Sequence, residues 1–234
     1  MTAENAPLDP RTTRIVDLGV GNLGNLERAV RALGHDAVVT DDPDLLASAE
    51  VILLPGVGAF RPPREALRGP LEDALRDALG RGAWLLGICV GFQLLFERGE
   101  EFGDTDGLGL LRGVIRRLPD TVDLPHIGWN ALDFRDGSHA LLEGLHDGAH
   151  AYFVHSFAAA ETESDEVIAT CRHGRDFPAI VGRDRVYGTQ FHPEKSGHEV
   201  GLVVLGNFLR MADAHRCAAS ATTNTIDESV EGGA

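Results

Sequence analysis

A cysteine between two glycines lies at a predicted strand-to-helix turn of this 234-residue sequence. The segment Gly87-Ile88-Cys89-Val90-Gly91 follows the apolar run AWLLGI and has the form G-x-[Ser/Cys]-x-G, which is typical of an exposed nucleophile on a tight turn. Glycines let the backbone turn sharply, and the free N–H groups of a helix N-terminus favour thiolate over thiol. A buried structural cysteine, the commoner role, needs neither glycine. We therefore predict that Cys89 is a catalytic nucleophile, whereas Cys171 and Cys217 lack the pattern.

A base for such a thiolate is predicted within GTQFHPEKS, residues 188–196, at the end of another apolar strand. In an extended chain, residues i and i+2 project to the same side. Glu194 then accepts a hydrogen bond from one ring nitrogen of His192, while the other nitrogen faces the sulfur. Alone, the HPE triplet fits a surface turn equally well. Together with the pattern around Cys89, it predicts a triad of Cys89, His192 and Glu194 for acyl transfer.

An acyl-transfer site also needs N–H donors for the developing oxyanion, and two segments offer them. The loop LPGVGAF, residues 54–60, follows a core strand, and its glycines suit a backbone that turns the N–H groups of Val57 and Gly58 toward a ligand. The N–H of Val90, next to the nucleophile, is the second expected donor. A plain strand-to-helix turn explains one glycine here, but it explains the PGVG run less well.

The elements that must position these residues alternate between strand and helix over the first hundred residues. The predicted strands are 14–18, 37–40, 51–55 and 83–88, and the predicted helices are 25–34, a short one begun by Asp42-Pro43, and a long one over 65–80. Such alternation predicts an α/β fold with an open, mostly parallel sheet flanked by helices. Ligands in sheets of this kind bind at the carboxyl ends of the strands.

From about Leu108 onward the pattern changes to short strand-like runs separated by turns, which predicts a more antiparallel C-terminal extension. A last helix is predicted over 197–213. Its buried face is expected to comprise Val200, Val203, Val204 and Phe208. We predict one catalytic domain over 14–213, an N-terminal extension over 1–13 and a disordered tail over 214–234.

Composition and charge exclude several classes of function. The formal net charge of −15 argues against nucleic acid or an anionic membrane as the main partner, because binding phosphate groups needs a basic face. No apolar run approaches the length of a membrane span, and the N-terminus lacks the apolar core of a signal peptide. Three cysteines without C-x-x-C or histidine-rich spacing indicate neither a disulfide framework nor a metal site. We expect a cytoplasmic protein without metal or cofactor, in which Lys195 is the only lysine.

One pattern points to a different chemistry. GVGNLG, residues 19–24, matches the dinucleotide-binding pattern G-x-G-x-x-G, and Asp41 and Asp42 follow about where a ribose-binding carboxylate lies in such proteins. Alone, the pattern is weak, and nothing downstream offers hydride chemistry. We interpret the glycines as a tight strand-to-helix turn and keep a nicotinamide enzyme as a minor alternative.

Six motifs together resemble the triad-type (class I) glutamine amidotransferases, and within them the branch of glutaminase subunits of imidazole glycerol phosphate synthase. In chain order the motifs are DLGVGNL, LPGVGAF, GICVGFQLLFE, PHIGWN, YFVHSF and GTQFHPEKS. The third and the last point to the amidotransferases, and the remaining motifs apart from the first indicate the branch. The resemblance spans most of the chain and implies a flavodoxin-like, class I glutamine amidotransferase fold.

By this resemblance, Cys89 attacks the side-chain amide of glutamine, His192 protonates the leaving ammonia and activates water, and Glu194 orients His192. The residues implied to form the oxyanion and glutamine sites are Val57, Gly58, Val90, Gln93, Glu101, Ser156 and Phe157. Glu101 is expected to receive the α-ammonium of glutamine, a role that the adjacent Glu100 also fits. Ammonia then passes to a cyclase subunit, a (β/α)₈ barrel, in a heterodimer of histidine biosynthesis. The implied partner face comprises Asn22, Trp129, Asn130 and Lys195.

Three other functions stay open at this point. The chain also fits a glutaminase subunit of another synthetase, such as those that make anthranilate or guanylate, or a stand-alone cysteine hydrolase. The third alternative is an idle binding subunit, although such a protein has no chemical need to keep Cys89, His192 and Glu194 together.

Overall fold

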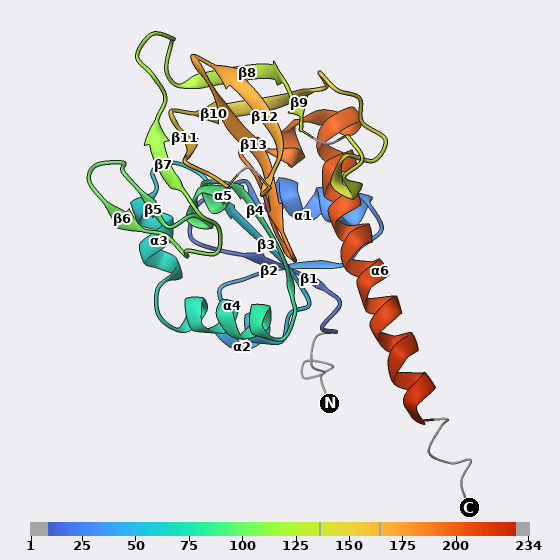
Figure 1. Cartoon of the computed structure of the whole chain (residues 1–234). Coiled ribbons are helices and arrows are strands. Elements are labelled where there is room, and N and C mark those ends of the chain that lie inside the picture. Colours follow the sequence, from blue (N-terminus) through green and yellow to red (C-terminus); the bar gives the residue numbers. More distant parts are fainter. Residues whose placement is uncertain (1–8, 136, 164, 228–234) are drawn as a thin grey trace, which may run out of the picture.

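The computed structural model describes residues 9–135, 137–163 and 165–227. Its main sheet has eight strands in the order β2-β1-β3-β4-β14-β13-β12-β9 (Figure 1). These strands are β1 Thr13–Val16, β2 Ala37–Thr40, β3 Val51–Gly56, β4 Trp84–Cys89, β9 Asp133–Phe134, β12 Val167–His173, β13 Arg175–Arg183 and β14 Val186–Thr189. Two smaller sheets, β10-β8 and β11-β7-β5-β6, complete the molecule. Their strands are β5 Arg98–Gly99, β6 Thr105–Asp106, β7 Val114–Arg117, β8 His126–Ala131, β10 His150–His155 and β11 Phe157–Ala160.

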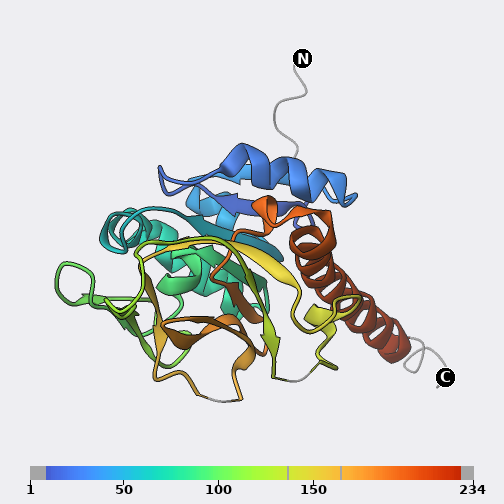
Figure 2. The same cartoon turned by 90° about the horizontal axis from the view of Figure 1, so that it is seen from above.

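The first half of the main sheet is parallel, as the alternation of strand and helix predicts. β1 pairs in parallel with β2 and β3, and β4 pairs in parallel with β3 and β14. β3 and β4 are buried along their whole length, which accounts for their continuous apolar runs. The longer helices and α2 are α1 Leu23–Ala32, α2 Pro43–Ala47, α3 Arg61–Leu67, α4 Pro70–Gly80 and α6 Leu202–Asp227. α1 contacts β1, β2 and α6, and α2 contacts β1 and α4. Figure 2 shows the same arrangement from above.

The second half is more antiparallel, also as predicted, with one exception. β13 pairs antiparallel with β12 and β14, and β12 with β9. The run 185–191, which was expected in the antiparallel extension, forms β14 and lies in parallel beside β4, with Thr189 opposite Ile88. Gly188 permits this central position, because a Cβ there would come within 2.6 Å of the Phe92 ring. The chain after β14 therefore emerges at the same sheet edge as Cys89.

Two predicted helices differ from those of the structure. The helix expected over 65–80 is divided into α3 and α4 at Gly69, which has a φ of +80°, and Pro70 begins α4 because proline lacks the N–H that a helix interior needs. The last helix extends past the expected boundary at residue 213 to Asp227, since 207–227 contains neither glycine nor proline to end it. Residues 1–8 and 228–234 of the predicted extension and tail lie outside the described residues. Within the described part of the chain, no helix has the length and apolar character to cross a membrane.

Candidate active site

Cys89 lies at the end of β4, directly before α5 (Val90–Leu94), with a φ of +56° and a ψ of −108° that side-chain-bearing residues rarely adopt. Both neighbouring glycines are sterically required. A Cβ on Gly91 would lie 1.7 Å from the Leu54 carbonyl oxygen, and a Cβ on Gly87 would lie 2.7 Å from the Gly91 carbonyl oxygen. The turn has the strained geometry that the G-x-Cys-x-G pattern predicts.

His192 and Glu194 approach this cysteine from the end of β14. The Glu194 Oε1 atom accepts a hydrogen bond of 3.0 Å from His192 Nδ1, and both side chains are buried. His192 Nε2 is also buried and makes no hydrogen bond to the described residues. Burial lowers the pKa of His192, but the adjacent Cys89 and Glu194 side chains outweigh burial and raise this pKa to about 10. The site therefore favours a protonated imidazole beside the sulfur, as a Cys-His pair requires.

The route by which Glu194 reaches His192 differs from the extended chain that the spacing suggested. Pro193–Lys195 forms one turn of 3₁₀ helix. The His192 carbonyl oxygen accepts hydrogen bonds from the Lys195 N–H over 3.0 Å and from the Ser196 hydroxyl over 2.7 Å. These bonds close the turn and bring the carboxylate back to the imidazole.

A cavity of about 440 Å³ opens beside the sulfur. Nine of the predicted oxyanion, glutamine-site and catalytic residues line it: Val57, Gly58, Cys89, Val90, Gln93, Glu101, Ser156, Phe157 and His192. Pro125, Val154 and His155 also line it and were not predicted, and Lys195, which was predicted for the partner face, lies on the same cavity. A concave site of this size with convergent polar groups suits a small polar ligand.

The two adjacent glutamates have separate surroundings. Glu100 is paired with Arg116, whose Nε lies 3.1 Å from its Oε1. Glu101 lines the cavity, and its Oε2 accepts a hydrogen bond of 2.8 Å from the Phe60 N–H. The structure thus assigns Glu101 rather than Glu100 to the cavity.

A buried pair of amides, Gln93 and Gln190, adjoins the nucleophile. Gln93 Nε2 donates to the Phe157 carbonyl oxygen over 3.0 Å and to Gln190 Oε1 over 3.1 Å. Gln190 Nε2 then lies 4.0 Å from the Cys89 sulfur, as a donor. Sequence analysis missed Gln190, although its position two residues before His192 in GTQFHPEKS offered a signal.

Two buried histidines, of which His155 also lines the cavity, extend this network. The His155 Nδ1 atom lies 2.9 Å from the Phe157 carbonyl oxygen, and His155 Nε2 lies 3.1 Å from His126 Nδ1. Asn130 Nδ2 lies 3.3 Å from the remaining His126 nitrogen, Nε2. Since an amide nitrogen and a carbonyl oxygen fix the two ends, each ring is neutral and donates through Nδ1. Burial lowers the pKa of His155 to about 3 and that of His126, which also faces His173, to about 4.

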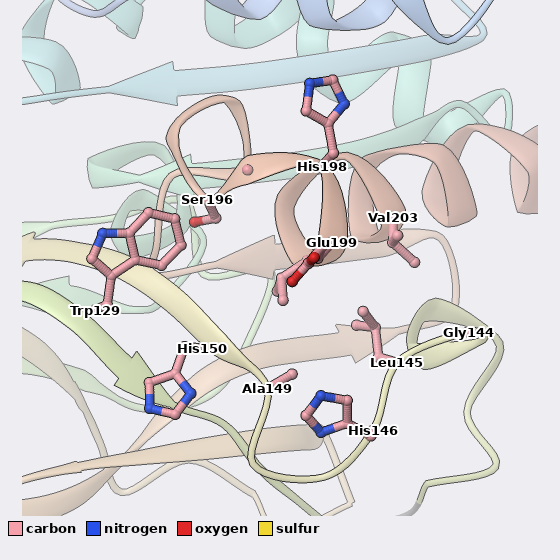
Figure 3. A pocket seen from close by; sticks show the side chains of 12 residues that line it. Trp129, Gly144, Leu145, His146, Ala149, His150, Ser196, His198, Glu199 and Val203 are labelled. Carbon is pink, nitrogen blue, oxygen red and sulfur yellow. The ribbon is translucent and has the colours of Figure 1, made fainter.

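The residues predicted for a partner face lie next to this site. Trp129 is 56% exposed, and Ile127 on the same strand is 61% exposed. Trp129 lines a second cavity of about 800 Å³, which Cys89, His192 and Glu194 do not line; Figure 3 shows Trp129, His150 and Glu199 around it. Lys195 is exposed, and its turn packs against α1, the helix that Asn22 precedes.

Comparison with known proteins decides the family. The family described as "Glutamine amidotransferase class-I" matches residues 14–212. The chain belongs to the class-I glutamine amidotransferases. This amidotransferase is 43% identical over 220 residues to "Imidazole glycerol phosphate synthase subunit HisH" of Salinibacter ruber, which covers 90% of this chain and 100% of that protein. It is 48% identical over 198 residues to the protein of the same name from Methanopyrus kandleri, covering 83% of this chain and 96% of that one.

The fold is shared with a known amidotransferase structure. A crystal structure of a glutamine amidotransferase superposes with a TM-score of 0.69 at 22% identity, covering 86% of this chain and 99% of that one. The predicted family, fold class and enzyme class are confirmed. The nicotinamide alternative is excluded by the family. The glycines that suggested it form the tight turn of our interpretation, with a φ of +72° at Gly19 and +127° at Gly21.

Proposed function

We propose that this amidotransferase is the glutaminase subunit of imidazole glycerol phosphate synthase in histidine biosynthesis. It hydrolyses glutamine to glutamate and ammonia and passes the ammonia to a cyclase subunit. The observation that carries the proposal is the buried arrangement of His192 and Glu194 beside Cys89, at a cavity of about 440 Å³. Identities of 43% and 48% to proteins named as subunits of that synthase support the pathway.

The chemistry proceeds through a thioester. The Cys89 sulfur attacks the amide carbon of glutamine, and the negative charge moves to the carbonyl oxygen. N–H groups of the Val57-Gly58 loop and of Val90 stabilise that oxygen. His192 Nε2–H gives its proton to the nitrogen as the C–N bond breaks and ammonia leaves. The neutral ring then takes a proton from water, which attacks the thioester and releases glutamate.

The remaining cavity residues hold the amino-acid end of glutamine. Glu101 carries the negative charge that suits an α-ammonium. Both N–H bonds of the Gln93 amide are used within the protein, so its Oε1 is the atom left for the substrate. Ser156 and Phe157 border the same space and fix the orientation of the substrate.

The partner is a cyclase subunit with a (β/α)₈ barrel, bound as a heterodimer over the face of Asn22, Trp129, Asn130 and Lys195. Exposed Trp129 supplies the large apolar area that anchors an interface. Lys195 has no ion-pair partner within the described part of the chain, so its flexible ammonium is available for a carboxylate of the partner. Because Lys195 also lines the glutamine cavity, this face adjoins the site where ammonia forms.

The test is glutamine hydrolysis by the purified chain, alone and with a histidine-pathway cyclase subunit and its nucleotide substrate. We expect strong stimulation by the partner with its substrate, and a loss of about 10³-fold or more in Cys89→Ala, in line with removal of other catalytic nucleophiles. Hydrolysis that needs Cys89 but ignores this partner would assign the chain to another synthetase. The absence of hydrolysis under every condition would contradict the proposal.

A further inference from the structure

The end of the oxyanion loop, residues 54–60, is fixed to the hairpin formed by β5 and β6, residues 98–106. The Phe60 N–H donates to Glu101 Oε2 over 2.8 Å, across 41 positions of sequence. The Phe60 ring is 1% exposed and packs on Gly99, where a Cβ would come within 2.7 Å of the ring. Backbone and side chain of one loop residue are therefore both held by this hairpin.

The residue after the loop makes further contacts with the same hairpin. Arg61 donates to the Phe102 carbonyl oxygen and to the Thr105 hydroxyl, each over 3.3 Å. The end of the loop is thus held to residues 98–106 by the hydrogen bond of the Phe60 N–H, the packing of the Phe60 ring and two hydrogen bonds of the Arg61 guanidinium group. Of the side chains in this set, the Glu101 carboxylate is the charged group that also lines the glutamine cavity.

We propose that Glu101 is a positioning residue for the oxyanion loop, in addition to its expected contact with the α-ammonium of glutamine, a contact that rests on the proposed function. One carboxylate oxygen holds the Phe60 N–H, and the other makes no hydrogen bond to the described residues. A carboxylate has acceptor sites on both oxygens, so it holds the loop and a substrate cation together. Recognition of the amino-acid head group and placement of the Val57 and Gly58 N–H groups then depend on one side chain.

Three substitutions separate the two roles. Glu101→Gln keeps a side-chain oxygen for the Phe60 N–H but removes the charge that an ammonium needs. Glu101→Ala removes both the acceptor for the Phe60 N–H and the negative charge. Asp104→Asn is the matched control, because it removes a carboxylate charge from the exposed turn of the same hairpin. Each variant is compared with the wild type in glutamine kinetics, with the cyclase partner and its substrate present, and in hydrogen–deuterium exchange of the peptide that contains residues 54–60.

In the kinetics, we expect Glu101→Gln to raise the KM for glutamine about tenfold or more, with kcat within about threefold of wild type, since a charged hydrogen bond to substrate is lost. Glu101→Ala should show the same rise in KM and a further fall in kcat of about tenfold or more, because misplaced oxyanion donors act on the transition state. Asp104→Asn should match the wild type.

In the exchange experiment, the 54–60 peptide should exchange faster in Glu101→Ala than in the wild type, Glu101→Gln or Asp104→Asn. Equal kcat and equal exchange in the two Glu101 variants would overturn the positioning role. If the wild type fails to hydrolyse glutamine, the proposed function fails, yet the exchange rates still decide whether Glu101 holds the loop.

Gly99→Ala perturbs the loop without touching Glu101. The added methyl meets the Phe60 ring, so the loop must shift while the Glu101 carboxylate is kept. We expect kcat to fall and the 54–60 peptide to exchange faster. A folded Gly99→Ala protein with wild-type kcat and exchange would also overturn the proposal.

Discussion

At the scale of single residues, the site depends on a histidine that is buried and yet keeps its proton. Burial alone disfavours an imidazolium. Here the Glu194 carboxylate, which accepts from Nδ1 over 3.0 Å, and the Cys89 sulfur together reverse that preference. In the proposed mechanism Glu194 therefore does more than orient the ring, because it also stabilises the charge with which His192 acts as an acid toward the leaving ammonia.

This charge predicts how stability changes with pH. Folding raises the pKa of His192 from 6.5 to about 10, so the protonated ring stabilises the folded state fully below about pH 6.5, and this contribution is lost as the pH rises toward 10. We expect the advantage of the wild type over His192→Asn in free energy of unfolding to shrink over this interval. Urea unfolding at several pH values measures it, with Cys89→Ala expected to show a weaker dependence. An advantage that stays constant would contradict the assignment.

At the scale of elements, the antiparallel strands β8 and β10 carry a chain of hydrogen-bonded polar groups. His126 and His155 lie opposite each other in the strand register, which brings their rings within hydrogen-bond distance. Their neutral state leaves each ring one donor and one acceptor, and both are used. This chain of hydrogen bonds ends at the Phe157 carbonyl oxygen, which also accepts from Gln93, so the two strands help fix a residue that lines the cavity beside Cys89.

Because these rings are neutral in the folded state, acid destabilises the protein. Folding lowers the pKa of His155 from 6.5 to about 3. Between these pH values the unfolded chain binds a proton at His155 that the folded chain does not bind, so the free energy of unfolding decreases as the pH falls below 6.5. We expect the wild type to lose up to about 1.4 kcal/mol per pH unit more than His155→Gln over this range. Urea unfolding measures the slopes, with exposed His150→Gln on the same strand as the control. Equal pH dependence of the free energy of unfolding in the wild type and His155→Gln would contradict a neutral His155 ring.

At the scale of the whole molecule, the turn that carries His192 and Glu194 is linked to the two-stranded sheet that carries Trp129, the residue that we propose for the partner face. Ser196 lines the cavity of about 800 Å³, and its hydroxyl donates to the His192 carbonyl oxygen over 2.7 Å and accepts from the Tyr152 N–H over 2.9 Å. The catalytic turn is thereby tied to β10, the strand that pairs with the Trp129 strand. We therefore expect a partner that binds over Trp129 to contact the turn that carries His192 and Glu194.

Local spacing predicted the parts of this molecule that depend on local structure. The strained turn at Cys89 and the strands on either side of it follow from glycine geometry and apolar runs. The position of β14 beside β4 could not be predicted in this way, because the partner of a short strand is decided by packing within the sheet rather than by the residue pattern of the strand itself. The bond between Phe60 and Glu101 was missed because it joins residues 41 positions apart. Gln190 was missed although it belongs to the GTQFHPEKS motif, because its contacts with Gln93 and Cys89 depend on the same sheet pairing.

The central claim is that Cys89 is the nucleophile toward glutamine. The most direct measurement is mass spectrometry of the protein after reaction with a glutamine analogue whose side chain ends in a diazoketone, with and without competing glutamine. We predict one covalent adduct, located at Cys89, slowed by glutamine and absent in Cys89→Ala, while Cys171 stays unmodified because burial raises the pKa of its thiol to about 12. An adduct elsewhere, or none in a preparation that hydrolyses glutamine, would contradict the account.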